Sequence, residues 1–437
     1  MRLVDQKTLV VLAIALVAGS ALYLIELYSK ERLGVETHTG IGKEGRSPTV
    51  RIGVVSPTQE SDPEYRFLAR LAESEINAYC NESGIDYRFE FVFGCAGGMA
   101  QEAQDETRRL HGLGANLSVG YAWSSQLCAS YNYFGEEHGM TVISTGSSSW
   151  ISCCRKEDRA FRICPYEGEL ARPLAQVVYS RGVTDLIVFK REDSWGRHMV
   201  DKISRELEEL GGRILIMVNY TGSTGSESGS NSPEFRPYLA QAESALSSVD
   251  EDARACAGVL ALSFSEIGMI LKEAEEYPLL MDIPWFMSDL SSNFSIQEEG
   301  SLDEASKVTL MSLKVNIPEN SVYRRVNEAY EAMFGEELGF YDANIYDACW
   351  LMALSAMEAN TTDGVAVSQV LPAVALGYRG ATGNFTLDEY GDRTNLDFDV
   401  LGFFDLDGEI RRLRCGLYIS SEDRIVWDEE LVNLPGC

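Results

Sequence analysis

Short apolar runs alternate with longer amphipathic segments over most of this 437-residue chain. Three amphipathic segments in the first half have apolar residues at helical spacing and predict helices at 65–80, 100–112 and 126–138. The apolar runs beside them are short and continuous and predict buried strands at 50–55, 87–93, 117–121 and 141–144. Strands separated by helices of this length indicate a parallel, doubly wound α/β sheet.

The same alternation begins again after residue 165. The apolar runs here predict a second set of strands, at 186–189, 213–220, 258–262, 284–287 and 308–315. Amphipathic segments between them predict helices at 196–210, 235–248 and 265–276. Two more helices are expected within 321–359, followed by strands at 383–388 and 398–404 and a hairpin turn at Asp407–Gly408. We therefore expect two α/β units, one after the other.

Residues 8–28 form an apolar stretch that only Gly19, Ser20 and Glu26 interrupt. About 20 apolar residues are enough to span a bilayer as a helix. Arg2 and Lys7 precede the stretch and favour a cytoplasmic N-terminus with the remainder exported. We predict a membrane anchor at 1–28 and a polar tether at 29–48. The alternative is a signal peptide cleaved near Ser20, which would give a secreted protein.

The charge and the cysteines restrict the partners and the compartment. Acidic residues outnumber basic ones by 67 to 37, for a net charge of −30, and no basic patch stands out. Nucleic acid and acidic membrane surfaces are therefore poor partners. Ten cysteines in an exported chain suggest disulfides, and Cys95–Cys128 and Cys415–Cys437 are the pairings that we expect.

Two strand ends carry the candidate chemistry, at 119–125 and 142–149. In each, an apolar strand breaks into small residues that bear hydroxyl groups, and the first then enters a helix. Free backbone N–H groups and hydroxyls at such a point bind a small anion such as a carboxylate. In an open parallel sheet, ligands bind beyond the carboxyl ends of the strands, which is where both segments lie.

Signatures of catalysis are absent from the sequence. None of the patterns H-E-x-x-H, G-x-S-x-G, the P-loop or G-x-G-x-x-G occurs. No pair of histidines has the spacing of metal ligands, and all four are expected on the solvated surface, at His38, His111, His138 and His198. We expect a protein that holds a ligand, with no cofactor, no metal and no reaction.

Several spaced segments resemble, in order, the type I periplasmic binding proteins, with the branched-chain amino acid (Leu/Ile/Val) binding proteins of ABC transporters as the closest subgroup. These segments are 52–57, 120–125, 143–148, 161–163, 194–196, 346–348 and 383–393. The resemblance covers about residues 49–415. It implies two Rossmann-like lobes joined by a three-strand hinge, with crossings near 162–165, 313–318 and 380–385. Lobe 1 would comprise 49–163 and 316–382, and lobe 2 would comprise 164–315 and 383–437.

The resemblance also implies a set of ligand-binding residues. Ser124 and Ser125 would bind the α-carboxylate of an amino acid with help from Thr145, Ser147 and Ser148. Asp289 would bind its ammonium group, Trp195 would close over it, and Tyr121 and Trp123 flank the first segment. The simpler interpretation makes the serines helix caps or loop residues, Asp289 a helix N-terminus or turn residue, and Trp195 a packing residue.

The function implied is that of an anchored, extracytoplasmic solute-binding protein that closes about its hinge on a small polar ligand. An ABC permease would then recognise the closed form. The alternative is the ligand-binding ectodomain of a sensory receptor with the same fold.

Overall fold

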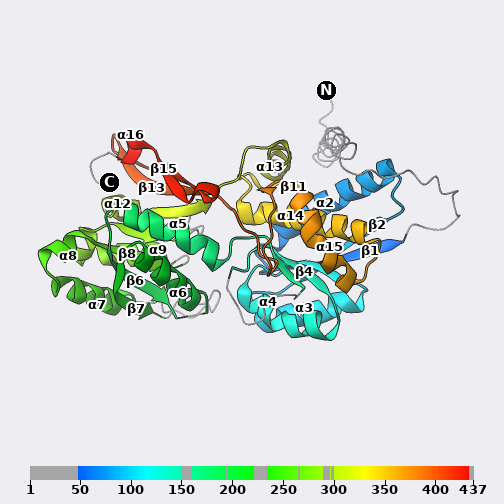
Figure 1. Ribbon diagram of the computed structural model, residues 1–437, viewed down its shortest axis with the longest axis horizontal. Coiled ribbons are helices and arrows are strands. Elements are labelled where there is room, and N and C mark those ends of the chain that lie inside the picture. The colour runs from blue at the N-terminus through cyan, green and yellow to red at the C-terminus, as the bar shows by residue number, and fades with distance from the viewer. Residues whose placement is uncertain are drawn as a thin grey trace, which may run out of the picture. The chain divides into compact units, whose positions relative to one another are not determined.

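A computed structural model describes residues 48–148, 159–192, 194–220, 234–263, 266–288, 296 and 300–432 of the protein. The expected anchor and almost all of the expected tether lie outside these residues. Within them, no helix combines the length and the apolar composition needed to cross a membrane. The described residues form two compact units (Figure 1).

Unit 1 contains residues 48–147, 159–164 and 317–393 of the described chain. Its parallel sheet has the order β2-β1-β3-β4-β5. The strands are β1 Thr49–Ser56, β2 Arg88–Cys95, β3 Leu117–Gly120, β4 Thr141–Ser144 and β5 Ala160–Arg162. All residues of β3 and β4 are buried, as expected for strands that helices cover on both faces. This confirms the predicted doubly wound sheet.

Helices on both sides of this sheet complete unit 1 (Figure 1). They are α2 Asp62–Ser83, α3 Ala100–Gly112, α4 Ser124–Tyr131, α13 Ser321–Phe334, α14 Phe340–Ala359 and α15 Gly364–Gly377. The helix predicted at 126–138 changes at Asn132 into a π-helical segment, Asn132–Glu137. The short β11 Arg379–Gly380 and β12 Gly383–Asn384 pair with each other.

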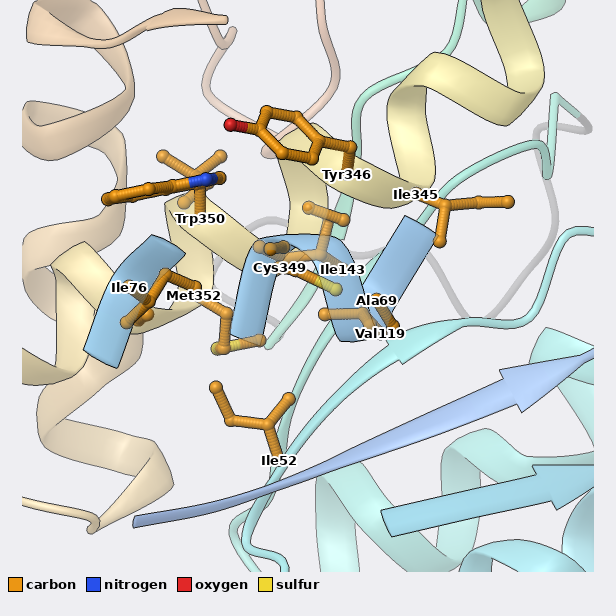
Figure 2. Packing of buried hydrophobic residues seen from close by; sticks show 14 of the residues in the cluster. Ile52, Ala69, Ile76, Val119, Ile143, Ile345, Tyr346, Cys349, Trp350 and Met352 are labelled. Carbon is orange, nitrogen blue, oxygen red and sulfur yellow. The ribbon is translucent and has the colours of Figure 1, made fainter. Parts of the chain in front are cut away.

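The core of unit 1 forms where α14 packs against α2 and the sheet. Helix α14 has apolar residues almost all round, because it is covered on most of its surface. Figure 2 shows Ile345, Cys349 and Met352 of α14 among buried side chains of α2 and of strands β1, β3 and β4. This contact holds α14 beside β3 and β4.

Unit 2 contains residues 165–316 and 394–432 of the described chain together with Ser148. Its sheet has the order β15-β14-β13-β10-β9-β8-β6-β7. Five strands are parallel, at β6 Asp185–Arg191, β7 Arg213–Tyr220, β8 Ala257–Leu262, β9 Trp285–Met287 and β10 Met311–Val315. Their order, 7-6-8-9-10, repeats the 2-1-3-4-5 order of unit 1. The second sheet is therefore a second doubly wound unit.

Three antiparallel strands extend this sheet beyond β10, at β13 Phe398–Leu406, β14 Glu409–Ile419 and β15 Arg424–Trp427. The predicted hairpin turn is confirmed, with φ of 57° at Asp407 and 85° at Gly408. The helices of unit 2 are α5 Glu167–Ser180, α6 Ser194–Glu209, α7 Arg236–Ser247, α8 Glu251–Ala255, α9 Ile267–Ala274, α10 Pro278–Met281, α12 Leu302–Lys307 and α16 Glu429–Val432. The elements that the sequence pattern did not predict include β5, β14 and β15 among the strands and α5 and α15 among the longer helices.

The third crossing between the units differs from the expectation. The sequence placed it at 380–385, whereas residues up to Arg393 belong to unit 1. The reason is that Arg393 donates to the carbonyl oxygens of Thr382 and Asn384, at 2.8 Å each, and Asp392 pairs with Arg162. The strand predicted at 383–388 is correspondingly reduced to Gly383–Asn384.

The predicted disulfides receive no support from the described residues. Cys95 is a free thiol, so the Cys95–Cys128 pairing is wrong. Cys437 lies outside the described residues, so the pairing of Cys415 with Cys437 stays a prediction. Cys80, Cys256 and Cys349 are also thiols, and burial raises the pKa of Cys80 to about 11.

Candidate functional site

The first predicted segment lies at the point where the strand order of unit 1 reverses. Strands β1 and β3 are neighbours, and helices leave their carboxyl ends on opposite faces of the sheet. Gly120 ends β3 with φ of 112°, and Tyr121 follows with φ of 51° and donates its N–H to the carbonyl oxygen of Val55 at 3.2 Å. These two residues turn the chain from β3 into the start of α4.

Helix α4 presents its first turn at this edge through Ser124 and Ser125. Ser125 is exposed and Ser124 is half-buried. The first N–H groups of a helix have no partner four residues earlier and carry partial positive charge. Two hydroxyls and a helix N-terminus at one place suit an acceptor group such as a carboxylate.

The structure brings the second predicted segment against the first. Ser147 donates its hydroxyl to the hydroxyl oxygen of Ser124 at 3.0 Å. Ser144 donates its hydroxyl to the carbonyl oxygen of Tyr121 at 3.0 Å and accepts the N–H of Ser147 at 3.1 Å. We call Ser124, Ser125 and Ser147 the serine cluster. Ser147 is fully buried, whereas Ser148 is half-buried.

Thr145 does not present its hydroxyl to solvent. The residue is 1% exposed, and its hydroxyl lies 3.0 Å from that of Tyr65 in α2. Its N–H donates to the carbonyl oxygen of Gly120 at 3.0 Å, and its own carbonyl oxygen accepts from Nδ2 of Asn344 in α14 at 3.3 Å. All three polar groups of Thr145 thus have partners inside unit 1, which places it as a structural residue.

The two aromatic residues that flank the first segment take opposite positions. Tyr121 is fully buried among apolar side chains, and its hydroxyl lies 2.8 Å from that of Thr107 in α3. Burial raises the pKa of Tyr121, so its phenol stays neutral. Trp123 is 42% exposed and is the flanking aromatic that a ligand can reach.

Of the residues predicted in unit 2, Trp195 lies in the first turn of α6 and is 8% exposed, and Asp289 lies outside the described residues. At the carboxyl edge of this sheet, Arg191 pairs with Glu266 at 2.8 Å, and the hydroxyl of Tyr220 donates to the same carboxylate at 3.0 Å. The hydroxyls of Ser263 and Ser288, which follow the neighbouring strands β8 and β9, are buried and have no hydrogen-bond partner in the part of the chain that the structure describes.

Sequence reasoning missed Tyr65 and Asn344. Tyr65 had the pattern of an ordinary core residue of α2, and Asn344 follows the first turn of α14 among mostly buried residues. No local motif marks either one, because each becomes part of the site only through packing between segments far apart in the chain.

The chain belongs to the receptor family ligand binding region, a non-enzymatic protein family whose model matches residues 68–404. A curated relative is an uncharacterized protein of Methanocaldococcus jannaschii, 21% identical over 83% of this chain and 87% of its own length.

Two solved structures place the fold among the type I periplasmic binding proteins. The substrate-binding protein of an ABC transporter from Desulfitobacterium hafniense, in complex with Leu, is 19% identical with a TM-score of 0.65, covering 84% of this chain and all of its own. The solute-binding protein of an ABC transporter from Rhodopseudomonas palustris, in complex with benzoate, is 15% identical with a TM-score of 0.62, covering 89% of this chain and 99% of its own. The predicted family resemblance is confirmed.

Proposed function

We propose that this protein is an extracytoplasmic solute-binding protein of an ABC transporter and that it binds an amino acid or a similar small carboxylate. One observation carries the proposal. The hydrogen bond from Ser147 to Ser124 joins two hydroxyl-rich strand ends at the edge of the sheet where ligands of doubly wound proteins bind.

In this proposal Ser124, Ser125 and the first N–H groups of α4 bind the carboxylate of the ligand, Ser147 orients the hydroxyl of Ser124, and Ser148 assists. Leucine and benzoate, the ligands of the two solved structures above, differ in size and shape but share a carboxylate. A site built from hydroxyls and a helix N-terminus recognises that shared group. Trp195 and Asp289 would complete the site by hinge closure, with Asp289 as the partner of an ammonium group.

The proposed location follows from the apolar stretch at residues 8–28, which is long enough to anchor the chain with its two units outside the cytoplasm. An ABC permease in the same membrane would be the partner. The family description, a ligand binding region of receptors, favours one alternative, the ectodomain of a sensory receptor. A neighbouring gene for a permease would support import, and a neighbouring kinase gene would support sensing.

Calorimetric titration of the purified protein with amino acids, their amides and aromatic carboxylates tests the proposal. We expect at least one free carboxylate to bind and its amide to bind much more weakly. Ser124→Ala and Ser125→Ala should weaken binding, whereas Ser130→Ala in the same helix should leave binding unchanged, because the buried hydroxyl of Ser130 has no partner within the described ranges. Equal binding of an acid and its amide would contradict the carboxylate site.

The anchor has a separate test. Expression with and without residues 1–28, followed by separation of membrane and soluble fractions, should release the protein only in the shortened form. Full-length protein in the soluble fraction with an intact N-terminus would contradict an uncleaved anchor.

A further inference from the structure

Two side chains from distant parts of the chain converge on Thr145. Tyr65 reaches its hydroxyl from α2, 80 residues earlier, at 3.0 Å. Asn344 reaches its carbonyl oxygen from α14, 199 residues later, at 3.3 Å. Tyr65 is 5% exposed and Asn344 is fully buried, so neither contact competes with water. Thr145 is thus fixed at both its side chain and its backbone.

In the sequence, Thr145 lies between Ser144 and Ser147 of the second predicted segment, 142–149. Ser144 and Ser147 bond to each other across it, and Ser147 continues to Ser124. The position of the Ser147 hydroxyl therefore depends on the backbone at Thr145. Binding sites need their polar groups held within about 0.5 Å of the productive geometry, and supporting residues provide that precision.

The side-chain amide of Asn344 lowers the stability of the folded state, because only one of its two ends is hydrogen-bonded within the described part of the chain. Its Nδ2 donates to Thr145, whereas its Oδ1 is buried and has no hydrogen-bond partner among the described residues. An unpaired buried acceptor is unfavourable, and a leucine of similar size would avoid that cost. A buried polar group without a full set of hydrogen bonds is expected mainly near functional sites, where its role offsets the loss of stability.

We propose that Tyr65 and Asn344 are positioning residues that hold the serine cluster in its ligand-binding geometry through Thr145. The expected change in ligand affinity rests on the proposed function. The restraint that Tyr65 and Asn344 place on residues 144–148 does not depend on any ligand.

Tyr65→Phe removes only the hydroxyl and is the direct test. A ligand found in the titration panel should bind about fivefold more weakly to this variant, as expected for one lost neutral hydrogen bond. Thr145→Val should give a similar loss, and the double variant should lose no more than either single one, because both remove the same contact. Asn344→Leu should also weaken binding without lowering the midpoint of unfolding.

Tyr346→Phe is the matched control. Tyr346 is a buried tyrosine of α14. Its hydroxyl accepts from Arg325 at 2.8 Å and donates to Glu75 of α2 at 2.5 Å, so its hydrogen bonds do not involve Thr145. This variant should unfold more easily while it binds the ligand with unchanged affinity. Equal losses of affinity in Tyr65→Phe and Tyr346→Phe, or wild-type affinity in a folded Tyr65→Phe, would overturn the inference.

Hydrogen exchange without ligand keeps the two proposals separate. The amides of residues 144–148 should exchange faster in Tyr65→Phe and Thr145→Val than in the wild type or Tyr346→Phe. If no panel compound binds the wild type, the proposed function fails while this measurement still decides the inference. Unchanged exchange of these amides in Tyr65→Phe would overturn it.

Discussion

Arg162 and Asp392 lie 230 residues apart in the sequence and form a buried ion pair with two hydrogen bonds, one of them 2.5 Å from Nε to Oδ1. Both side chains are at most 1% exposed. Arg162 ends β5 just before the first crossing to unit 2, and Asp392 stands just before the third. The pair therefore ties two of the connecting segments together on the side of unit 1.

Removing one partner of this pair should be far more damaging than removing both. Asp392→Ala takes this carboxylate away from the buried guanidinium of Arg162, and we expect a loss of about 3–5 kcal/mol in the free energy of unfolding. The double variant Arg162→Met, Asp392→Ala should recover part of that loss. Urea denaturation of the three proteins measures both effects.

Glu276→Ala provides the control, because its pair with Arg236 is about half exposed on both sides. Exposed pairs contribute about 0–1 kcal/mol. Equal effects of Asp392→Ala and Glu276→Ala would show that the Arg162 pair is not structurally important.

Gly120 tolerates no side chain. A Cβ at this position would lie 2.1 Å from the carbonyl oxygen of Val55, and φ of 112° is unfavourable for any other residue. We expect Gly120→Ala to lower stability by about 3 kcal/mol or more, because the obstacle is backbone in a central strand. Gly84→Ala is the control, since its φ is also positive at 67° but no atom of the described residues lies within 4 Å of the added carbon. It should cost about 1 kcal/mol, so a larger effect there would contradict the steric explanation.

The sequence was informative about regular elements and poor at the contacts between them. Continuous apolar runs such as 117–121 predicted the buried strands, because such runs reflect burial within the strand itself. The same pattern placed Ser124 and Ser147 at strand ends, and the structure brings them together. It could not show that Thr145 faces inward, because that depends on Tyr65, 80 residues away. The position of the third crossing, after Arg393 instead of at 380–385, was missed for a similar reason. It depends on the ion pair between Asp392 and Arg162, which are 230 residues apart.

Asp342 should make stability depend on pH. Burial, with smaller contributions from the charges of Glu64 and Glu336, raises its pKa from 3.8 to about 6. A carboxyl whose pKa is higher in the folded than in the unfolded state favours folding while protonated, and that contribution is lost as pH rises through about 6. Asp342→Asn stays neutral throughout. It should therefore be more stable than the wild type at pH 7.5, by about 1–2 kcal/mol for this half-buried group, and similar at pH 4.

A second variant assigns this pH dependence to the acidic neighbours. Of the two nearby carboxylates, Glu64 raises the pKa of Asp342 more than Glu336 does. Glu64→Gln removes that charge and should therefore lower the pKa of Asp342. The stability difference between the wild type and Asp342→Asn should then shrink when both are compared in a Glu64→Gln background. A difference that is the same at pH 4 and pH 7.5 would contradict the raised pKa.

Ser147 offers a test of how the serine cluster works, because it is fully buried and bonds Ser124 instead of facing solvent. Its hydroxyl donates to the oxygen of Ser124, so Ser147→Ala should affect ligand binding only through Ser124. We expect about fivefold weaker binding in the Ser147→Ala variant, from the loss of one neutral hydrogen bond, and no further loss when it is combined with Ser124→Ala. Ser148→Ala, at a half-buried position, should instead add its effect to that of Ser124→Ala. Additive losses for Ser147→Ala and Ser124→Ala would mean that the two hydroxyls act independently and that the bond between them does not orient the site.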